Sequence, residues 1–119
     1  MRSFIKSMIA TCVMVSVTAQ ATVRGSDCVT VTGVVNAVGG GAVMLALSPA
    51  IPGCTPNTIP GVEFAVGVNG VTAANLGAYL ASGLAALATG RQVQVIYDDS
   101  SSNCYGLQIG NGGFQGQCP

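Results

Sequence analysis

Few side chains in this sequence could carry acid–base or nucleophilic chemistry. The 119 residues include no histidine, four acidic residues and four basic residues. Asp98 and Asp99 are adjacent, and on a strand they would point to opposite faces, so they cannot serve one substrate as an acid–base pair. The glycines at 39–41 precede no Lys-Ser/Thr pair, so they do not form a phosphate-binding loop. The sequence therefore predicts that this chain is not an enzyme and holds no cofactor.

The cysteines indicate disulfide bonds rather than a metal site. Cys12 belongs to the N-terminal segment described in the next paragraph, which leaves Cys28, Cys54, Cys104 and Cys118. An even number in a small exported chain, without a CxxC motif or a histidine, is typical of two disulfides. The spacing is too wide and irregular for a structural zinc site. Asp98, Asp99 and the polar residues that follow them supply too few oxygen ligands for calcium. We expect no metal site.

The first 21 residues have the pattern of a secretory signal peptide. Arg2 and Lys6 precede an apolar run at 8–17, and the small-x-small triplet at 19–21 follows it. The apolar run is about half the length of a membrane-spanning helix, which needs about 20 residues. We therefore predict a signal peptide at 1–21, one domain at 22–119, and a secreted or periplasmic location.

The charge of the mature chain argues against nucleic acid as a partner. Its two arginines stand apart in the sequence, whereas a protein that binds a phosphate backbone gathers its cations in a patch. The charged residues from 22 onward are Arg24, Asp27, Glu63, Arg91, Asp98 and Asp99. They give a net charge of −2, because two positive charges face four negative ones.

The order of the expected elements is three strands, one helix and two strands. The first strand starts at Cys28 and changes its facing at Gly33, where the alternation breaks. The helix runs from a Thr72 cap to Thr89 and ends at Gly90. The remaining strands are expected at 42–48, 62–68, 91–98 and 104–110. This mainly β order with one helix is that of the OB-fold, a five-stranded Greek-key barrel.

A flat α+β sheet with one covering helix has the same element order, and the bend at Gly33 favours the barrel. The barrel also favours one of the three possible disulfide pairings. It places the first strand near the chain end, and the loop at 49–61 near the turn at 99–103. We therefore favour Cys28–Cys118 and Cys54–Cys104.

The helix has no charged residue on any side. A leucine stripe, made of Leu76, Leu80, Leu84 and Leu87 with Tyr79 at its edge, is expected to cover the core. The rest of the circumference is small, and we assign it to an interface between copies of the chain through Ala74, Ala78, Ala81, Ala85 and Ala88. Two alternatives are an alanine-rich helix exposed to water and a membrane-inserted helix. The helix is short for the latter, so we expect no membrane insertion.

The run "ATGRQVQVIYDD" at 88–99 resembles the helix-to-strand junction of the B subunit of subtilase cytotoxin and its relatives. The run "TGVV" at 32–35 is similar to the first strand of that family. The family consists of exported OB-fold proteins that assemble as pentamers and bind glycans. The resemblance implies a sugar pocket that contains Thr32 and Tyr97, with Asp27 as an approximate match for an acidic residue before the first strand.

Thr32 stands where the family has serine, and its added methyl group could fill space that a sugar substituent needs. Tyr97 offers a sugar an apolar ring face and a polar edge, although the same ring could simply close the barrel. The prediction is a secreted carbohydrate-binding subunit in a homopentamer, with a cell-surface glycan and a possible separate catalytic subunit as partners. A stand-alone secreted OB-fold interaction or inhibitor module is the alternative, and a membrane-active protein is a weaker third one.

Overall fold

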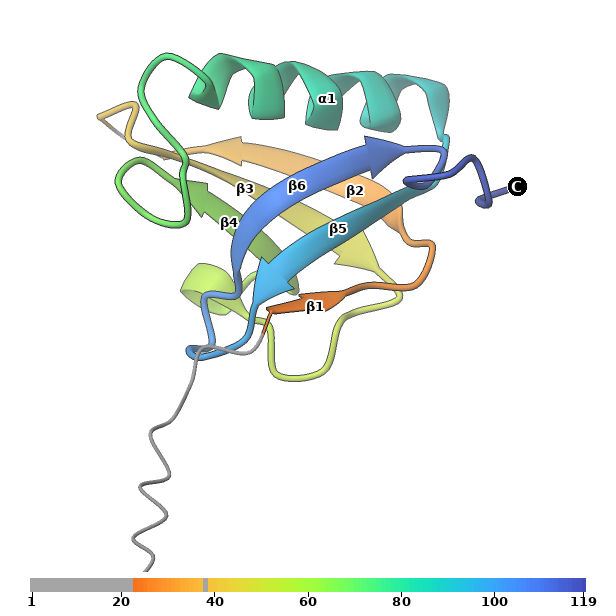
Figure 1. The fold of residues 1–119 in the computed structure, drawn as a ribbon, viewed down its shortest axis with the longest axis horizontal. Helices are drawn as coiled ribbons and strands as arrows, with labels where there is room; N and C mark the ends of the chain where they lie inside the picture. The colour runs from red at the N-terminus through yellow and green to blue at the C-terminus, as the bar shows by residue number, and fades with distance from the viewer. Residues whose placement is uncertain (1–22, 38) are drawn as a thin grey trace, which may run out of the picture.

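The computed structural model describes residues 23–37 and 39–119, so the predicted signal peptide at 1–21 lies outside the described residues. The described chain is mainly β with one α-helix (Figure 1). Its elements are β1 (Val23–Gly25), β2 (Thr30–Asn36), β3 (Ala42–Ser48), a 3-10 turn (Pro56–Thr58), β4 (Gly61–Ala65), α1 (Leu76–Thr89), β5 (Val93–Asp98) and β6 (Tyr105–Asn111). The predicted order is confirmed from β2 onward, and β1 is an additional strand.

The strands form one mixed sheet in the order β1-β5-β6-β4-β3-β2. Every neighbouring pair is antiparallel except β4 and β6, which run parallel. The ladder of named strands is open, because β1 and β2 are its two edges. Between them, Val29 forms an isolated bridge with Val93 of β5, through backbone hydrogen bonds of 2.9 and 2.8 Å.

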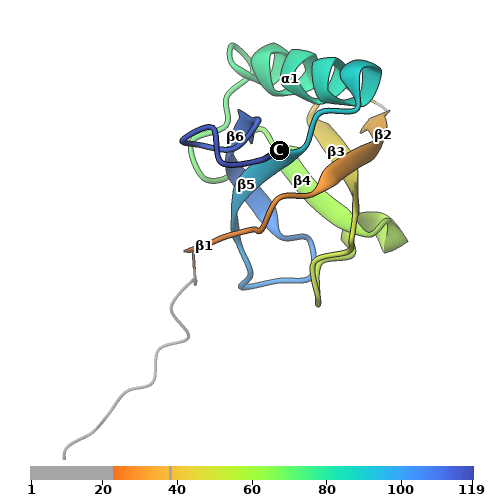
Figure 2. The same cartoon turned by 90° about the vertical axis from the view of Figure 1, so that its right-hand side faces the viewer.

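The predicted break in the first long strand is confirmed. Val31 pairs with Leu47 and Gly33 pairs with Ala46, so Thr32 is the extra residue of a β-bulge between them. A bulge bends its strand and increases the local twist. In Figures 1 and 2 the sheet curves, with α1 at one end of the fold and β1 at the other.

The core contains side chains from β2 to β6 and from α1. Its most deeply buried members are apolar: Val43, Leu45, Val62, Phe64, Val71, Val93 and Val95. The ring of Phe64 stacks on that of Tyr79 with centroids 4.4 Å apart, and the Tyr79 hydroxyl donates to the Leu107 carbonyl at 2.7 Å. Tyr79 thus joins helix α1 to the sheet in two ways, through ring stacking on β4 and through a hydrogen bond to β6.

The start and the end of α1 follow two local signals. Thr72 and Asn75 exchange hydrogen bonds: the Thr72 N–H donates to Asn75 Oδ1 at 2.7 Å, and the Asn75 N–H donates to Thr72 Oγ1 at 3.1 Å. This reciprocal pair resembles a capping box, and it moves the first regular helical residue from the predicted cap region to Leu76. At the other end, Gly90 adopts a left-handed conformation and its N–H donates to the Ala86 carbonyl, as expected of a helix terminator.

The predicted leucine stripe is wrong in its second half. Leu84 and Leu87 are 47% and 40% exposed, whereas Gly83 and Ala86 are buried. The cause is a close approach between α1 and β3: a Cβ atom on Gly83 would lie 2.6 Å from Leu45 Cδ2. The second half of the helix therefore turns Gly83 and Ala86 toward the sheet and leaves two leucines outside.

Both disulfides of the favoured pairing are present in the structure. Cys28–Cys118 joins the start of β2 to the chain end, and Cys54–Cys104 joins the loop before β4 to the turn before β6. The second bond holds two loops that also contact each other through the backbone, because the Thr55 N–H donates to the Ser102 carbonyl at 2.8 Å.

Candidate functional site

A pocket of about 180 Å³ lies between the segment after β1, the loop after β3 and strand β5. We call it the Asp27 pocket. Its lining includes two of the three residues assigned to sugar binding, Asp27 and Tyr97. The other lining residues are Gly25, Ser26, Val29, Pro49, Ala50, Ile51 and Pro52. An apolar lining with a few polar groups is typical of small-molecule sites.

Tyr97 reaches the pocket from the inner face of β5. The alternation along this strand turns Val93, Val95 and Tyr97 toward the core, and the tyrosine is only 7% exposed. Its side chain belongs to the core cluster, so it fills the core and lines the pocket at once. Among residues 23–37 and 39–119, its hydroxyl has no hydrogen-bond partner, although most buried hydroxyls have one.

Asp27 lines the pocket and is exposed. Its neighbour Ser26 is fixed to β5 from both sides: the Ser26 N–H donates to the Val95 carbonyl at 2.8 Å, and Ser26 Oγ accepts from the Val95 N–H at 2.9 Å. Ser26 Oγ also donates to the carbonyl of Asp27 at 2.8 Å. The backbone that carries the carboxylate is therefore held in place, and within the described residues the carboxylate has no ion-pair partner.

Thr32, the third predicted sugar-binding residue, does not line the pocket. It is the bulged residue of β2, and it is exposed. The structure therefore brings Asp27 and Tyr97 together and leaves Thr32 apart.

The loop at 49–52 lines the pocket, although the sequence did not indicate it as part of a site. Four prolines from Pro49 to Pro60 predict irregular structure, which is wrong only at the 3-10 turn Pro56–Thr58. The loop is about a dozen residues long, and loops of this length are usually functional or pinned, so its length was the available signal.

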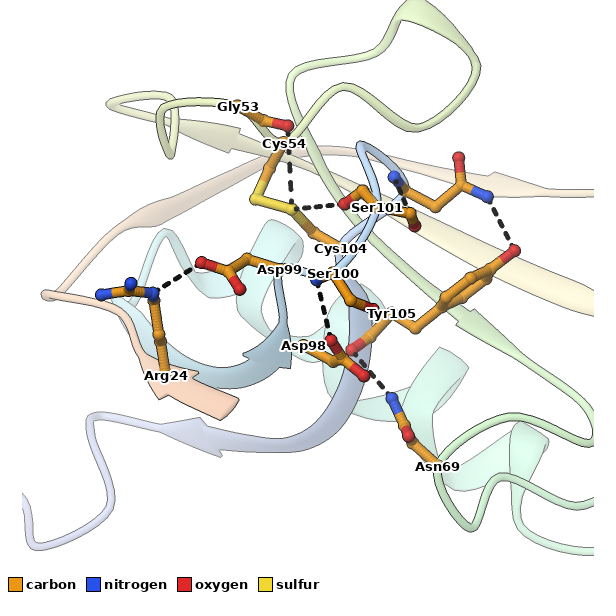
Figure 3. The surroundings of a disulfide bond; sticks show 11 residues. Arg24, Gly53, Cys54, Asn69, Asp98, Asp99, Ser100, Ser101, Cys104 and Tyr105 are labelled. Atoms are coloured by element: carbon orange, nitrogen blue, oxygen red, sulfur yellow. Dashed lines mark hydrogen bonds and ion pairs between the residues drawn. A yellow bond between two sulfur atoms is a disulfide. The ribbon is translucent and has the colours of Figure 1, made fainter. Parts of the chain in front are cut away.

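The two adjacent carboxylates at the end of β5 make separate contacts (Figure 3). Asp99 accepts from Arg24 Nε at 2.6 Å, which joins the turn after β5 to β1. Asp98 is buried and accepts a hydrogen bond from the Ser100 N–H at 2.9 Å. This bond, with smaller contributions from the side chains of Ser100 and Asn69, lowers the pKa of Asp98 below its ordinary value. Both carboxylates therefore hold the turn after β5.

A second, wider depression lies between α1 and β6. Its volume is about 310 Å³, and its lining includes Ala78, Tyr79, Ser82, Ile109 and the exposed ring of Phe114. We call it the α1–β6 groove. It contains no charged side chain.

The five alanines assigned to an interface are all exposed: Ala74, Ala78, Ala81, Ala85 and Ala88. Ala74 lies in the turn before α1 rather than on the helix itself. With Leu84 and Leu87, the other four form an uncharged surface, which we call the outer face of α1.

Two further properties concern metal ions and membranes. Within 23–37 and 39–119, no group of three or more His, Cys, Asp or Glu side chains could hold a metal ion. No helix in the same described ranges is long and apolar enough to cross a membrane.

Comparison with protein-family models, with curated proteins and with solved structures finds no match for this chain. The resemblance to the B subunit of subtilase cytotoxin therefore stays a prediction.

Proposed function

We propose that this chain is a secreted carbohydrate-binding subunit that works as a homopentameric ring. The observation that carries the proposal is the meeting of Asp27 and Tyr97 in one pocket. A carboxylate accepts strong hydrogen bonds from hydroxyl groups, and a tyrosine offers an apolar body with a polar tip. Sugars present both kinds of partner, and the proline-rich side of the pocket suits their apolar C–H surface.

The proposal includes an OB-fold barrel. In such a barrel a single bent first strand pairs with two different neighbours, and the chain has five strands. Here β1 and β2 would be the two parts of that strand, because β1 pairs with β5 and β2 pairs with β3. The bridge between Val29 and Val93 lies between these two pairings and supports this assignment.

The ring rests on the surface of α1. Leu84 and Leu87 extend from one flank of the helix, and the α1–β6 groove lies along the other flank, which carries Ala78 and Ser82. A ring needs a head-to-tail contact between two different patches of each copy, and these two uncharged surfaces are a suitable pair. Burial of the outer face of α1 would also remove two exposed leucines from water.

We propose no catalytic role for the chain itself. A ring-forming sugar binder of this kind would deliver or anchor a separate catalytic subunit. The two disulfides are typical of an oxidising compartment, which agrees with export through the predicted signal peptide at 1–21.

Glycan binding and solution mass test the proposal together. Mature protein from an oxidising compartment would be measured by light scattering and applied to a glycan array. We expect about five chains per particle and binding to at least one class of glycan. Tyr97→Phe removes the pocket hydroxyl and keeps the ring in the core, so it should weaken binding about five- to tenfold.

Tyr105→Phe is the matched control, because the Tyr105 hydroxyl accepts from Asn103 Nδ2 and does not line the Asp27 pocket. This variant should bind like the unmodified protein. A folded pentamer without affinity for any glycan would refute the carbohydrate-binding role.

The exposed leucines of α1 favour one second candidate, a stand-alone secreted module that binds or inhibits a protein partner. Leu84 and Leu87 would then contact that partner instead of another copy. A clean monomer in light scattering would support this candidate and contradict the ring.

A further inference from the structure

The charge of the Asp27 pocket restricts the sugars that it can accept. Asp27 is the one charged side chain among the lining residues. Neither arginine of the described chain lines the pocket, and each has a contact elsewhere. Arg24 Nε donates to Asp99 at 2.6 Å, and the Arg91 guanidinium lies against Gly112, where an added Cβ atom would come within 2.7 Å of it. Arg24 stands opposite Tyr97 on β5, but its guanidinium is paired with Asp99. Asp27 therefore has no ion-pair partner within the described residues.

A negative pocket discriminates between neutral and anionic ligands. Two like charges a few ångströms apart near a protein surface repel by an amount that corresponds to about tenfold or more in affinity. The Asp27 carboxylate can accept hydrogen bonds from the hydroxyls of a neutral sugar, whereas a sialic acid carboxylate or a sulfate group would bring a second negative charge to it.

The other lining groups also suit a neutral ring. Val29, Ile51 and the prolines at 49 and 52 supply apolar contact area. The Tyr97 hydroxyl can both donate and accept a hydrogen bond. The volume of about 180 Å³ is below the range of roughly 300–1,000 Å³ that drug-sized ligands occupy. The space fits one terminal sugar rather than an extended oligosaccharide.

We propose that the Asp27 pocket binds a terminal neutral monosaccharide and rejects terminal sugars that carry a carboxylate or a sulfate. This inference rests on the proposed carbohydrate-binding function and adds the chemical class of its ligand. Asp27 is the residue that determines the specificity.

The test uses matched glycans that differ only at their end. A galactose-terminated glycan, its sialylated form and its sulfated form would be immobilised at equal density, and the mature protein would be titrated over each. We expect the neutral glycan to bind at least about tenfold more tightly than either anionic form. Added salt should reduce this ratio, because it screens the repulsion at the exposed carboxylate.

Asp27→Asn removes the negative charge with little change of shape, so the ratio between neutral and anionic glycans should fall toward one. Glu63→Gln is the matched control. It makes the same change of net charge on β4, away from the pocket, and should leave the ratio unchanged.

The outcomes separate the inference from the function on which it rests. Equal or tighter binding of the sialylated glycan by the unmodified protein would overturn the inference and leave carbohydrate binding intact. An unchanged ratio in Asp27→Asn would also overturn it, because the selectivity would then have another origin. Absence of binding to every glycan by folded protein would refute the carbohydrate-binding function itself.

Discussion

The Asp27 pocket and the outer face of α1 lie at opposite ends of the fold, and they are built from different residue types. Four of the six charged side chains in the described chain, those of Arg24, Asp27, Asp98 and Asp99, lie near the β1 end. The disulfide Cys54–Cys104 holds the loops of that end together. Helix α1 has neither a charge nor a cysteine, and it packs on the core through Leu76, Tyr79 and the small residues Gly83 and Ala86.

The two surfaces are therefore held in place by different interactions. A disulfide and polar bonds hold the loops around the pocket, in addition to the apolar contacts of Val29, Ile51 and Tyr97. Close packing holds α1, where one added methyl group would meet Leu45. Substitutions should therefore act by different mechanisms at the two ends.

The largest effect is expected from the loss of a disulfide at the pocket end. The double variant Cys54→Ala/Cys104→Ala should lower the free energy of unfolding by about 2–5 kcal/mol, as is typical for a small exported domain. Equilibrium urea unfolding followed by circular dichroism would measure it. A loss of less than about 1 kcal/mol would mean that non-covalent contacts suffice at this end.

The other disulfide provides the matched comparison. Cys28–Cys118 spans 90 residues and Cys54–Cys104 spans 50 residues. If the bonds act by restricting the unfolded chain, Cys28→Ala/Cys118→Ala should cost about 0.5 kcal/mol more than the first double variant. The reverse order would indicate that native contacts around the pocket loop contribute to the effect.

A smaller effect, with opposite signs at two positions, is expected in α1. Gly83→Ala places a Cβ atom 2.6 Å from Leu45 Cδ2 in the core, and overpacking of this kind costs about 1–3 kcal/mol. Gly77→Ala meets open space on the same helix and should stabilise the protein by up to about 1 kcal/mol through helix propensity. Thermal unfolding of both variants would measure the difference.

Equal effects of the two substitutions would contradict the close approach of α1 to β3. This pair separates packing from propensity, because both variants replace glycine by alanine within one helix.

Local signals in the sequence were sufficient for several elements of the fold. The break at Gly33, the helix end at Gly90 and the alternation of β5 each depend on residues close together in the chain. The disulfide pairing followed from the expected arrangement of strands, which the order of elements largely determined.

The rotation of α1 could not be predicted from its own residues. Hydrophobicity favoured Leu84 and Leu87 as core residues, but the contact between Gly83 and Leu45 decides which side faces the sheet. These two residues are far apart in sequence. The Asp27 pocket was only partly predictable for a similar reason, because Pro49 and Ile51 join it through the path of a loop without periodicity.

The polar bonds at the pocket end predict a dependence of stability on acid. Hydrogen bonds from Ser100 lower the pKa of Asp98 in the folded state, so the charged form of this residue stabilises the fold. That contribution is complete above the pKa of an unfolded aspartate, about 3.9, and is lost as the pH falls through the lower folded pKa. Asp98→Asn should therefore flatten the loss of stability below about pH 4.

The charged form of Glu63 should have the opposite effect on stability to that of Asp98. Burial raises its pKa on β4, so stability falls as the pH rises from the unfolded pKa to the folded pKa, and the cost is complete above the folded pKa. Glu63→Gln should leave stability at pH 7 unchanged or slightly higher. Urea unfolding of both variants between pH 2.5 and 7 would compare them, and a destabilised Glu63→Gln would contradict this assignment.

The smallest effect on stability is expected on the outer face of α1. Leu84 is 47% exposed, so Leu84→Gln should change the free energy of unfolding of a single chain by no more than about 0.5 kcal/mol. Leu76, which is 8% exposed on the same helix, is the control, since Leu76→Ala should cost about 2–5 kcal/mol. Light scattering of Leu84→Gln then shows whether the exposed leucine contacts another copy of the chain. A smaller particle with unchanged chain stability would place Leu84 in a contact between copies, whereas a large loss of chain stability would return it to the core and remove the contrast between the two ends.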